Sequence, residues 1–239
     1  MVLLGFVGEA QADYVTGARL SDRTLCTKVD WIERDVLDDY RTWIGVEGGD
    51  PCLLWRAVRA TAKQRSLKAH GHFGGEPGLP DARTARLALL LFAALQDRPQ
   101  AVLLVRDTDC DTRRQRGLTQ ARDDRAWPFR VVIGAAHTKR ECWVLAGFDP
   151  LDSVEKDRLK TEREKLGFDP CTQAAELTAI HDYDKKSAKR VLSELTAGDA
   201  GRESACLEAD LEILRSRGER TGLRAFLEEL EERVLPLFH

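Results

Sequence analysis

The chain has 239 residues, of which 43% are hydrophobic and 32% are charged, and its formal net charge is -3. This composition allows one domain with a sizeable core and excludes a largely disordered chain. The small acidic excess does not indicate a basic nucleic-acid-binding domain, although carboxylates neutralised by a bound cation would still allow one.

The six cysteines include no C-x-x-C pair, and their spacing fits no zinc module. Reduced thiols in a cytoplasmic protein are therefore expected. The apolar start, residues 1–7, is too short for a signal peptide and is followed at once by Gly8 and Glu9. Because no apolar run approaches the ~20 residues of a membrane span, we expect no membrane partner.

The N-terminal segments predict the opening of an α/β unit. Residues 2–7 form a short apolar run ended by Gly8, which is typical of a buried strand. The composition of residues 10–25 favours a helix, and the carboxylate of Asp13 could cap its start. Residues 29–55 hold three of the five tryptophans and predict irregular structure with one strand or short helix.

The middle of the chain continues this alternation. Residues 54–66 indicate a helix, residues 69–80 a glycine- and proline-rich loop, and Asp81 the N-cap of a helix over residues 82–96. Residues 101–105 (AVLLV) are a continuous apolar run, as expected for a central parallel strand covered on both faces.

After the acidic run that follows this strand, a helix is expected through Arg125, then a strand over residues 129–133 and a helix over residues 141–146. From Ser153 onward every segment predicts helix. The segments with the clearest helical pattern there are 153–166, 172–195 and 207–237.

This order of elements predicts an α/β fold, with a parallel sheet flanked by helices in residues 1–150 and a helical C-terminal extension in residues 151–239. Ligands of such sheets bind beyond the carboxyl ends of the strands. Glu9 follows the first strand, and Asp107 and Asp109 follow the central one, so acidic residues are expected at that edge.

The acidic run of Asp107, Asp109 and Asp111 could open a helix–loop–helix calcium site. Such a loop needs glycine at its sixth position and glutamate at its twelfth, where this chain has Thr112 and Leu118. The calcium interpretation therefore fails on two required residues.

A magnesium site is the second interpretation of the run. Asp107 and Asp109 are two residues apart, so in extended backbone they point to the same side and repel unless a cation lies between them. Oxygen ligands at a sheet edge suit Mg²⁺ or Mn²⁺, with Glu9 as a third ligand or a general base and Asp111 as a further ligand. Aspartates after a strand also cap helices and bend turns, so a purely structural role stays open.

Two segments carry a family resemblance. GFVGEAQADY near the start and AVLLVRDTDCD about a hundred residues later resemble the Toprim fold, which topoisomerases, primases and OLD-family nucleases share. AHTKRECWVLAGFDP and LTAIHDYDKKSAKRVLSEL are similar to segments of bacterial Toprim-like proteins.

The resemblance implies a role for each matching residue. Glu9 would be a metal ligand or general acid/base, Asp107 and Asp109 metal ligands, and Glu141 a further acidic catalytic residue. The implied phosphate contacts are Lys139 and Arg140.

Other basic residues are weaker candidates for nucleic-acid contacts, because a charge run is usually just a solvated face. Arg113, Arg114 and Arg116 follow the acidic run, and a second group is spaced as on a helix face: Lys185, Lys186, Lys189 and Arg190.

Histidines and cysteines give further candidates. His137 is an auxiliary candidate, although a histidine at a helix start is more often structural. His70 and His72 lie in a glycine-rich loop without a clear third metal ligand. Cys110 is not expected to be reactive, because neighbouring aspartates raise a thiol's pKa.

The sequence leaves two main candidate functions open. The first is a Mg²⁺-dependent Toprim-like nuclease that acts on nucleic acid, with an ABC/SMC-like or AAA ATPase partner implied by the resemblance alone and a homo-oligomer also allowed. The second is a non-catalytic regulatory or partner-binding subunit on the same scaffold. Ala10, at a position where Toprim domains often have glycine, and the modest acidity of the chain favour the second. Another phosphoryl or nucleotide enzyme is a weaker third.

Overall fold

The computed structural model describes residues 1–238, and its internal contacts divide the chain into two compact units. The sheet unit contains Met1–Arg106, Asp111–Ala135 and Phe226–His239, and the helical unit contains Asp107–Cys110 and Ala136–Ala225. The predicted domain boundary at residue 150 stays a prediction.

The sheet unit is built on a mostly parallel sheet with strand order β2-β1-β6-β7, and the short β3 also pairs with β1. The strands are β1 (Val2–Gly8), β2 (Arg41–Ile44), β3 (Leu53–Leu54), β6 (Ala101–Asp107) and β7 (Arg130–Ala136).

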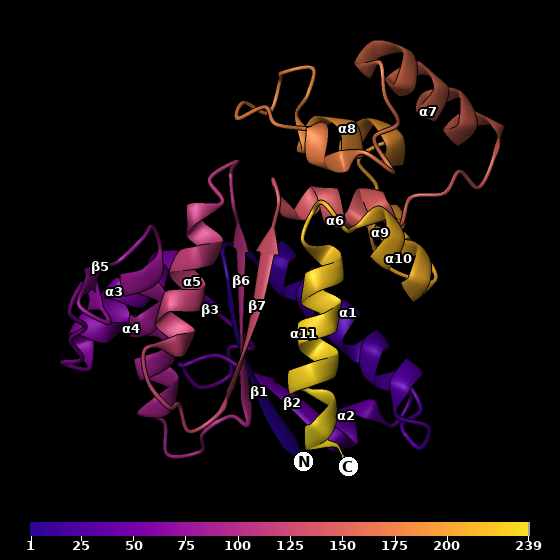
Figure 1. Cartoon of the computed structure of the whole chain (residues 1–239). Helices are drawn as coiled ribbons and strands as arrows, with labels where there is room; N and C mark the ends of the chain where they lie inside the picture. The colour runs from indigo at the N-terminus through magenta and orange to yellow at the C-terminus, as the bar shows by residue number, and fades with distance from the viewer. Residues whose placement is uncertain (239) are drawn as a thin grey trace. The chain divides into compact units, whose positions relative to one another are not determined.

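The two central strands, β1 and β6, run parallel with Leu4 opposite Ala101 and Val7 opposite Leu104. At the start of β7, Arg130 N donates to the carbonyl of Gln100, 2.9 Å away, so β7 begins beside β6. Figure 1 shows the arrows of β6 and β7 pointing the same way. The prediction of an α/β fold with a mostly parallel sheet and flanking helices is confirmed.

Helices cover both faces of this sheet, with α3, α4 and α5 on one side and α1 and the C-terminal part of α11 on the other (Figure 1). On the second side Phe6 packs so closely against Gly17 of α1 that a Cβ on Gly17 would lie 2.6 Å from its ring. The bounds are α1 (Gln11–Lys28), α3 (Trp55–Gln64), α4 (Ala82–Ala93), α5 (Arg113–Asp123) and α11 (Leu223–Arg233).

The predicted loop over residues 69–80 contains a small antiparallel hairpin, β4 (His72–Phe73) and β5 (Glu76–Pro77). Arg86 of α4 is fully buried beneath it and ion-pairs with Asp124. Its guanidinium also donates to the carbonyls of His70 and His72 at 2.7 and 2.9 Å. Both terminal nitrogens of this buried charge are hydrogen-bonded, which ties the hairpin to two helices.

The helical unit is organised around α6, whose residues Cys142, Trp143 and Val144 are completely buried. The indole N–H of Trp143 donates to the carbonyl of Thr221 at 2.8 Å, and α6 packs against α8, α9 and α10. The helices of this unit are α6 (Arg140–Ala146), α7 (Ser153–Leu166), α8 (Ala188–Thr196), α9 (Ala200–Cys206) and α10 (Leu211–Arg217).

The short elements not yet given are α2 (Leu37–Tyr40) and two 3₁₀ turns, Ala174–Glu176 and Leu235–Leu237. The expectation of irregular structure with one strand or short helix over residues 29–55 is confirmed in part, since one short helix (α2) and two short strands (β2 and β3) lie there. Within residues 1–238 no helix combines the length and apolar character needed to cross a membrane.

The C-terminal prediction of long helices is wrong in two places. The stretch 172–195 is α-helical only from Ala188, because Ser187 caps α8 there by accepting the N–H of Arg190 at 3.2 Å. The stretch 207–237 is interrupted between α10 and α11. Gly218 lies at this interruption, and a Cβ on it would be only 2.4 Å from the carbonyl oxygen of Leu214.

The predicted cap at Asp81 is right in position and wrong in mechanism. Asp81 is the N-cap residue of α4, but it has a left-handed φ of 66° and its carboxylate accepts no hydrogen bond from the helix start. That carboxylate instead accepts from Arg106 Nε at 3.0 Å. A competing ion pair therefore replaces the expected cap.

Gly117 sets the packing of α5 on the chain before α4, because a Cβ there would lie 1.9 Å from the carbonyl oxygen of Pro80. We predict that Gly117→Ala lowers the free energy of unfolding by about 2–3 kcal/mol, since backbone must shift to admit the methyl group. Urea denaturation measures the change. Gly48→Ala is the control, because a Cβ at Gly48 meets nothing within 4 Å, and equal stability of the two variants would contradict the packing argument.

Glu162 of α7 is an almost completely buried acid, paired with Arg190 of α8 at 2.7 Å and with Lys165 at 2.9 Å. Burial alone would raise its pKa, but the hydrogen bonds from Arg190 and Lys165 outweigh burial and hold the pKa below its ordinary value of 4.5. A lowered folded-state pKa stabilises the fold above the unfolded value, and this contribution is lost as pH falls through the folded value.

We therefore predict that Glu162→Gln destabilises the protein by about 2–4 kcal/mol near neutral pH, because Arg190 is left without its charged partner. The difference from wild type should shrink as the pH falls below the ordinary carboxyl pKa. Urea denaturation across this pH range measures it. Glu164→Gln, at an exposed position of the same helix, should change little at any pH, and a pH-independent cost of Glu162→Gln would contradict the ion-pair explanation.

Candidate functional site

Glu9 follows β1 directly, in a turn that Asp13 holds. The carboxylate of Asp13 accepts the backbone N–H groups of Glu9 at 2.7 Å and of Ala10 at 2.8 Å. The predicted capping by Asp13 is confirmed, although Asp13 acts from the first turn of α1 and Ala10 occupies the N-cap position. This buried carboxylate fixes the backbone from which the Glu9 side chain projects.

Glu9 is one of two carboxylates held by Arg106, the residue of β6 before Asp107. Arg106 Nη1 lies 2.7 Å from Glu9 Oε1, and its Nε lies 3.0 Å from Asp81 Oδ2. Arg114 Nε lies 3.9 Å from the same Asp81 oxygen. Two carboxylates and two guanidinium groups therefore balance one another at the carboxyl ends of β1 and β6.

Sequence reasoning missed Arg106 and Asp81 as members of this cluster. Arg106 could have been found from the pairing of the two apolar runs. In a parallel pair in which Val7 lies opposite Leu104, the residues two positions further along the two strands, Glu9 and Arg106, also lie opposite each other. Trp55 stabilises the same strand end, because its indole N–H donates to the carbonyl of Val105 at 2.7 Å.

In the helical unit, the D-x-D segment is tied to the chain after β7. Thr108 N donates to the carbonyl of Ala136 at 2.9 Å, and Asp109 N donates to that of Thr138 at 3.0 Å. Asp107 Oδ1 accepts the backbone N–H of Arg140 at 2.8 Å, at the start of α6. Asp107 therefore has a structural role at the start of α6, which was one of the alternatives left open by the sequence.

The D-x-D turn also contains two consecutive left-handed residues, Asp109 with φ 45° and Cys110 with φ 66°. Aspartate tolerates this region better than cysteine, and such residues persist only where their surroundings fix them. Burial, followed by the charge of Asp109, raises the pKa of the Cys110 thiol. The expected direction of this pKa shift is confirmed.

His137 lies beside this turn, with Nδ1 2.9 Å from the hydroxyl of Thr108. Burial lowers the pKa of His137, and the charge of Arg220 lowers it further. His137 is therefore held as a neutral imidazole near neutral pH, able to exchange a hydrogen bond with Thr108.

Lys139, Arg140 and Glu141 at the start of α6 all have ion-pair partners. Lys139 lies 3.7 Å from Asp182, while Arg140 lies 3.4 Å from Glu141 and 3.6 Å from Glu203. A phosphate would have to compete with these carboxylates for either cation.

Two further groups of predicted residues have contacts of their own. Asp111 pairs with Arg113 at 2.8 Å on the surface of the sheet unit, and the hydrogen bond from Arg113 lowers the pKa of Asp111. Lys185 and Lys186 precede α8 rather than lying on it, so the predicted helical stripe is wrong for these two lysines.

The carboxylates of Asp107 and Asp109 are suitable donors for Mg²⁺, which is often held by one or two carboxylates together with water and substrate phosphate. A metal site enclosed by protein ligands would need three or more such side chains together. Across residues 1–238, no three His, Cys, Asp or Glu side chains are grouped so as to hold a metal ion. Asp107 and Asp109 therefore offer oxygen donors of the kind that Mg²⁺ prefers, and the described residues form no dedicated metal cage.

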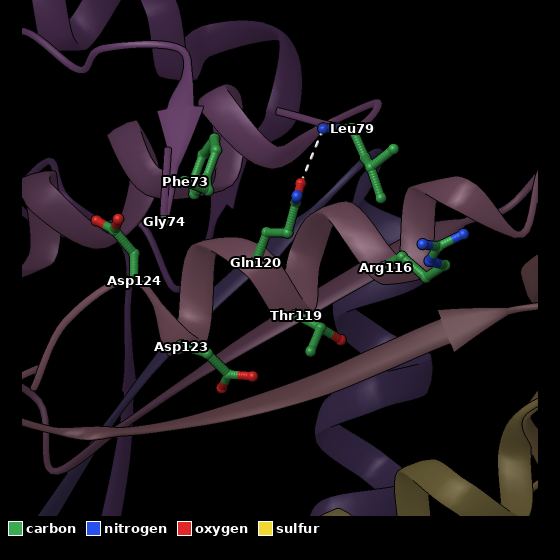
Figure 2. Close-up of a pocket in the computed structure, with 8 residues that line it drawn as sticks. All are labelled: Phe73, Gly74, Leu79, Arg116, Thr119, Gln120, Asp123 and Asp124. Carbon is green, nitrogen blue, oxygen red and sulfur yellow. Dashed lines mark hydrogen bonds between the residues drawn. The ribbon is translucent and has the colours of Figure 1, made fainter. Parts of the chain in front are cut away.

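A separate hollow of about 420 Å³ lies between the β4–β5 hairpin and α5 (Figure 2). In it the side-chain oxygen of Gln120 accepts the backbone N–H of Leu79 at 2.8 Å. Asp124, on its wall, is already paired with buried Arg86. Among the predicted basic residues only Arg116 lines this hollow, so it is not the predicted metal site.

Comparisons with protein-family models, curated proteins and solved structures gave no match for this chain. The resemblance to Toprim domains therefore rests on the sequence motifs alone.

The hydrogen bond from Arg140 N to Asp107 predicts a difference between two substitutions. Asp107→Ala should lower the free energy of unfolding by about 1 kcal/mol, as for loss of a helix cap. Asp107→Asn should cost clearly less, because its amide oxygen accepts the same N–H. Urea denaturation of both variants measures this, and equal losses would show that the hydrogen bond does not stabilise α6.

Proposed function

We propose that this chain is a Mg²⁺-dependent nuclease of the Toprim type that cleaves phosphodiester bonds of nucleic acid. The observation that carries the proposal is the parallel pairing of β1 with β6, which places Glu9 beside Arg106, the residue immediately before Asp107-Thr108-Asp109. A strand-end glutamate next to the strand that carries a D-x-D run is the arrangement that the motif resemblance implies.

The conformation of the D-x-D turn also supports the proposal. Asp109 and Cys110 are both left-handed, and the backbone N–H groups of Thr108 and Asp109 are anchored by hydrogen bonds to the carbonyls of Ala136 and Thr138. Strained backbone that is held rigidly often occurs at functional sites, where it fixes the position of reacting groups.

In this proposal Asp107 and Asp109 are the metal ligands, and a bound Mg²⁺ would polarise a phosphoryl oxygen and make water more acidic. Glu9 would accept a proton from the attacking water, with His137 as an auxiliary proton acceptor because its imidazole is neutral. Glu141 would be a further acidic catalytic residue. Lys139 and Arg140 would meet the phosphate charge as it develops.

The proposed partners follow from the resemblance. Nucleic acid is the substrate, and an ABC/SMC-like or AAA ATPase, as in bacterial phage-defence systems, is the proposed accessory subunit. A cytoplasmic location and self-association belong to the same proposal.

The test is cleavage of labelled single- and double-stranded DNA and RNA by the purified chain with Mg²⁺ or Mn²⁺. We expect Asp107→Asn and Asp109→Asn to reduce cleavage to background, because each removes a charged ligand from the ion. Asp107→Asn is informative because it keeps the acceptor for Arg140 N. Asp157→Asn, at an exposed position of α7, is the matched control and should cleave like wild type.

Absence of cleavage on every substrate, or full activity of Asp107→Asn, would refute the proposal. The regulatory-subunit alternative then gains support from a specific observation: Glu9 is ion-paired to Arg106, and Asp107 caps α6. Truncation near residue 149 is a poor test of that alternative, because Phe226–His239 belongs to the sheet unit. Calorimetric titration of Mg²⁺ into the full chain is better, since a scaffold has no need of the ion.

A further inference from the structure

A second hollow in the sheet unit, of about 820 Å³, is lined by α3, the chain that follows it and the start of α4. Four exposed cations line it: Arg59, Lys63, Lys68 and Arg83. No aspartate or glutamate is among its described lining residues, and its apolar part includes Ala62 and Leu87. It is therefore a cationic hollow in a chain whose net charge is negative.

Carboxylate partners distinguish these four cations from arginines such as Arg86. In the part of the chain that the structure describes, no carboxylate lies within ion-pair distance of any of them. Arg59 donates to the hydroxyl of Thr84 at 3.4 Å, and Arg83 donates to the carbonyl of Ala69 at 3.1 Å. By contrast, Arg86 is paired with Asp124 in the same unit. The charge of the hollow is thus not neutralised within the protein.

The spacing of the cations on α3 suits a ligand with repeated negative charges. Arg56, Arg59 and Lys63 lie at positions i, i+3 and i+7, on one face of α3, while Val58 and Ala62 are buried. At 1.5 Å per residue, neighbouring cations of this row are separated by roughly 4.5–6 Å along the helix axis. Lys68 and Arg83 extend the positive charge beyond the row, so the hollow exceeds what one small anion needs.

We infer that this hollow binds the sugar-phosphate backbone of a nucleic acid. Rows of lysine and arginine that neutralise successive phosphates supply most non-specific affinity for nucleic acid. His70 contributes the one aromatic ring of the described lining, and no Phe, Tyr or Trp lies there on which a base could stack. The binding is therefore mainly electrostatic and independent of base sequence. The inference concerns binding only and does not rest on the metal chemistry proposed for Asp107 and Asp109.

The test is fluorescence anisotropy of a labelled oligonucleotide with the full chain, in the presence of EDTA so that cleavage is prevented. Lys63→Gln/Lys68→Gln should bind at least about ten-fold more weakly at low salt. The slope of log affinity against log salt should fall by about 1.4 for a single strand, or roughly 0.7 for each lost contact. Lys156→Gln/Lys160→Gln, at exposed positions of α7, removes the same charge and should bind within about two-fold of wild type.

Three further measurements make the assignment specific. Lys63→Arg/Lys68→Arg should restore binding, because it restores charge, and unchanged urea midpoints should show that all variants are folded. Asp107→Asn should bind as tightly as wild type, which separates this site from the proposed catalytic one.

Unchanged affinity of Lys63→Gln/Lys68→Gln, or an equal loss in the α7 control, would overturn the inference. Tighter binding of polyglutamate than of an oligonucleotide of equal charge would also overturn it, in favour of an acidic protein partner.

Discussion

The parallel pairing of β1 with β6 is the constraint on which the rest of the sheet unit depends. Phe6, Val7 and Leu103 are completely buried, and each such side chain contributes about 2 kcal/mol when it leaves water. A shift of one residue in the pairing would turn every side chain of one strand to the opposite face. The apolar core therefore fixes the register, and the register in turn fixes which polar residues meet beyond the strand ends. The pairing of Glu9 with Arg106 is a consequence of core packing.

The elements that could be predicted from the sequence are those with a strong local signal. The apolar runs of β1 and β6 and the helix after Asp81 needed only composition and length. The Arg106 cluster could not be read in this way, because ion pairs between segments far apart in the chain leave no periodic pattern. The same limit explains Asp81, whose expected cap competes with Arg106 for one carboxylate, and the late start of α8, where Ser187 decides the boundary.

The D-x-D turn shows why a structural and a catalytic interpretation of one carboxylate are not exclusive. Asp107 accepts the backbone N–H of Arg140 through Oδ1, and a carboxylate has two oxygens and about four acceptor positions. A hydrogen bond of this kind orients the side chain, as hydrogen bonds do for metal-ligating carboxylates in general. The left-handed conformations of Asp109 and Cys110 are harder to explain by helix capping alone. The hydrogen bonds that Thr108 N and Asp109 N donate to the carbonyls of Ala136 and Thr138 hold this turn in place.

Net charge proves to be a poor guide to where this chain could bind a polyanion. The formal charge of -3 sums groups that mostly neutralise one another locally, as Arg86 and Asp124 or Arg190 and Glu162 do. What a ligand meets is the charge left after such pairing, concentrated where low-dielectric walls focus the field. The cations that line the α3 hollow keep their charge beside the apolar residues Ala62 and Leu87. The cations at the start of α6, in contrast, are ion-paired with carboxylates. The proposed backbone binding at α3 and the proposed phosphate chemistry at the D-x-D turn therefore make different demands on the chain, and neither proposal depends on the other.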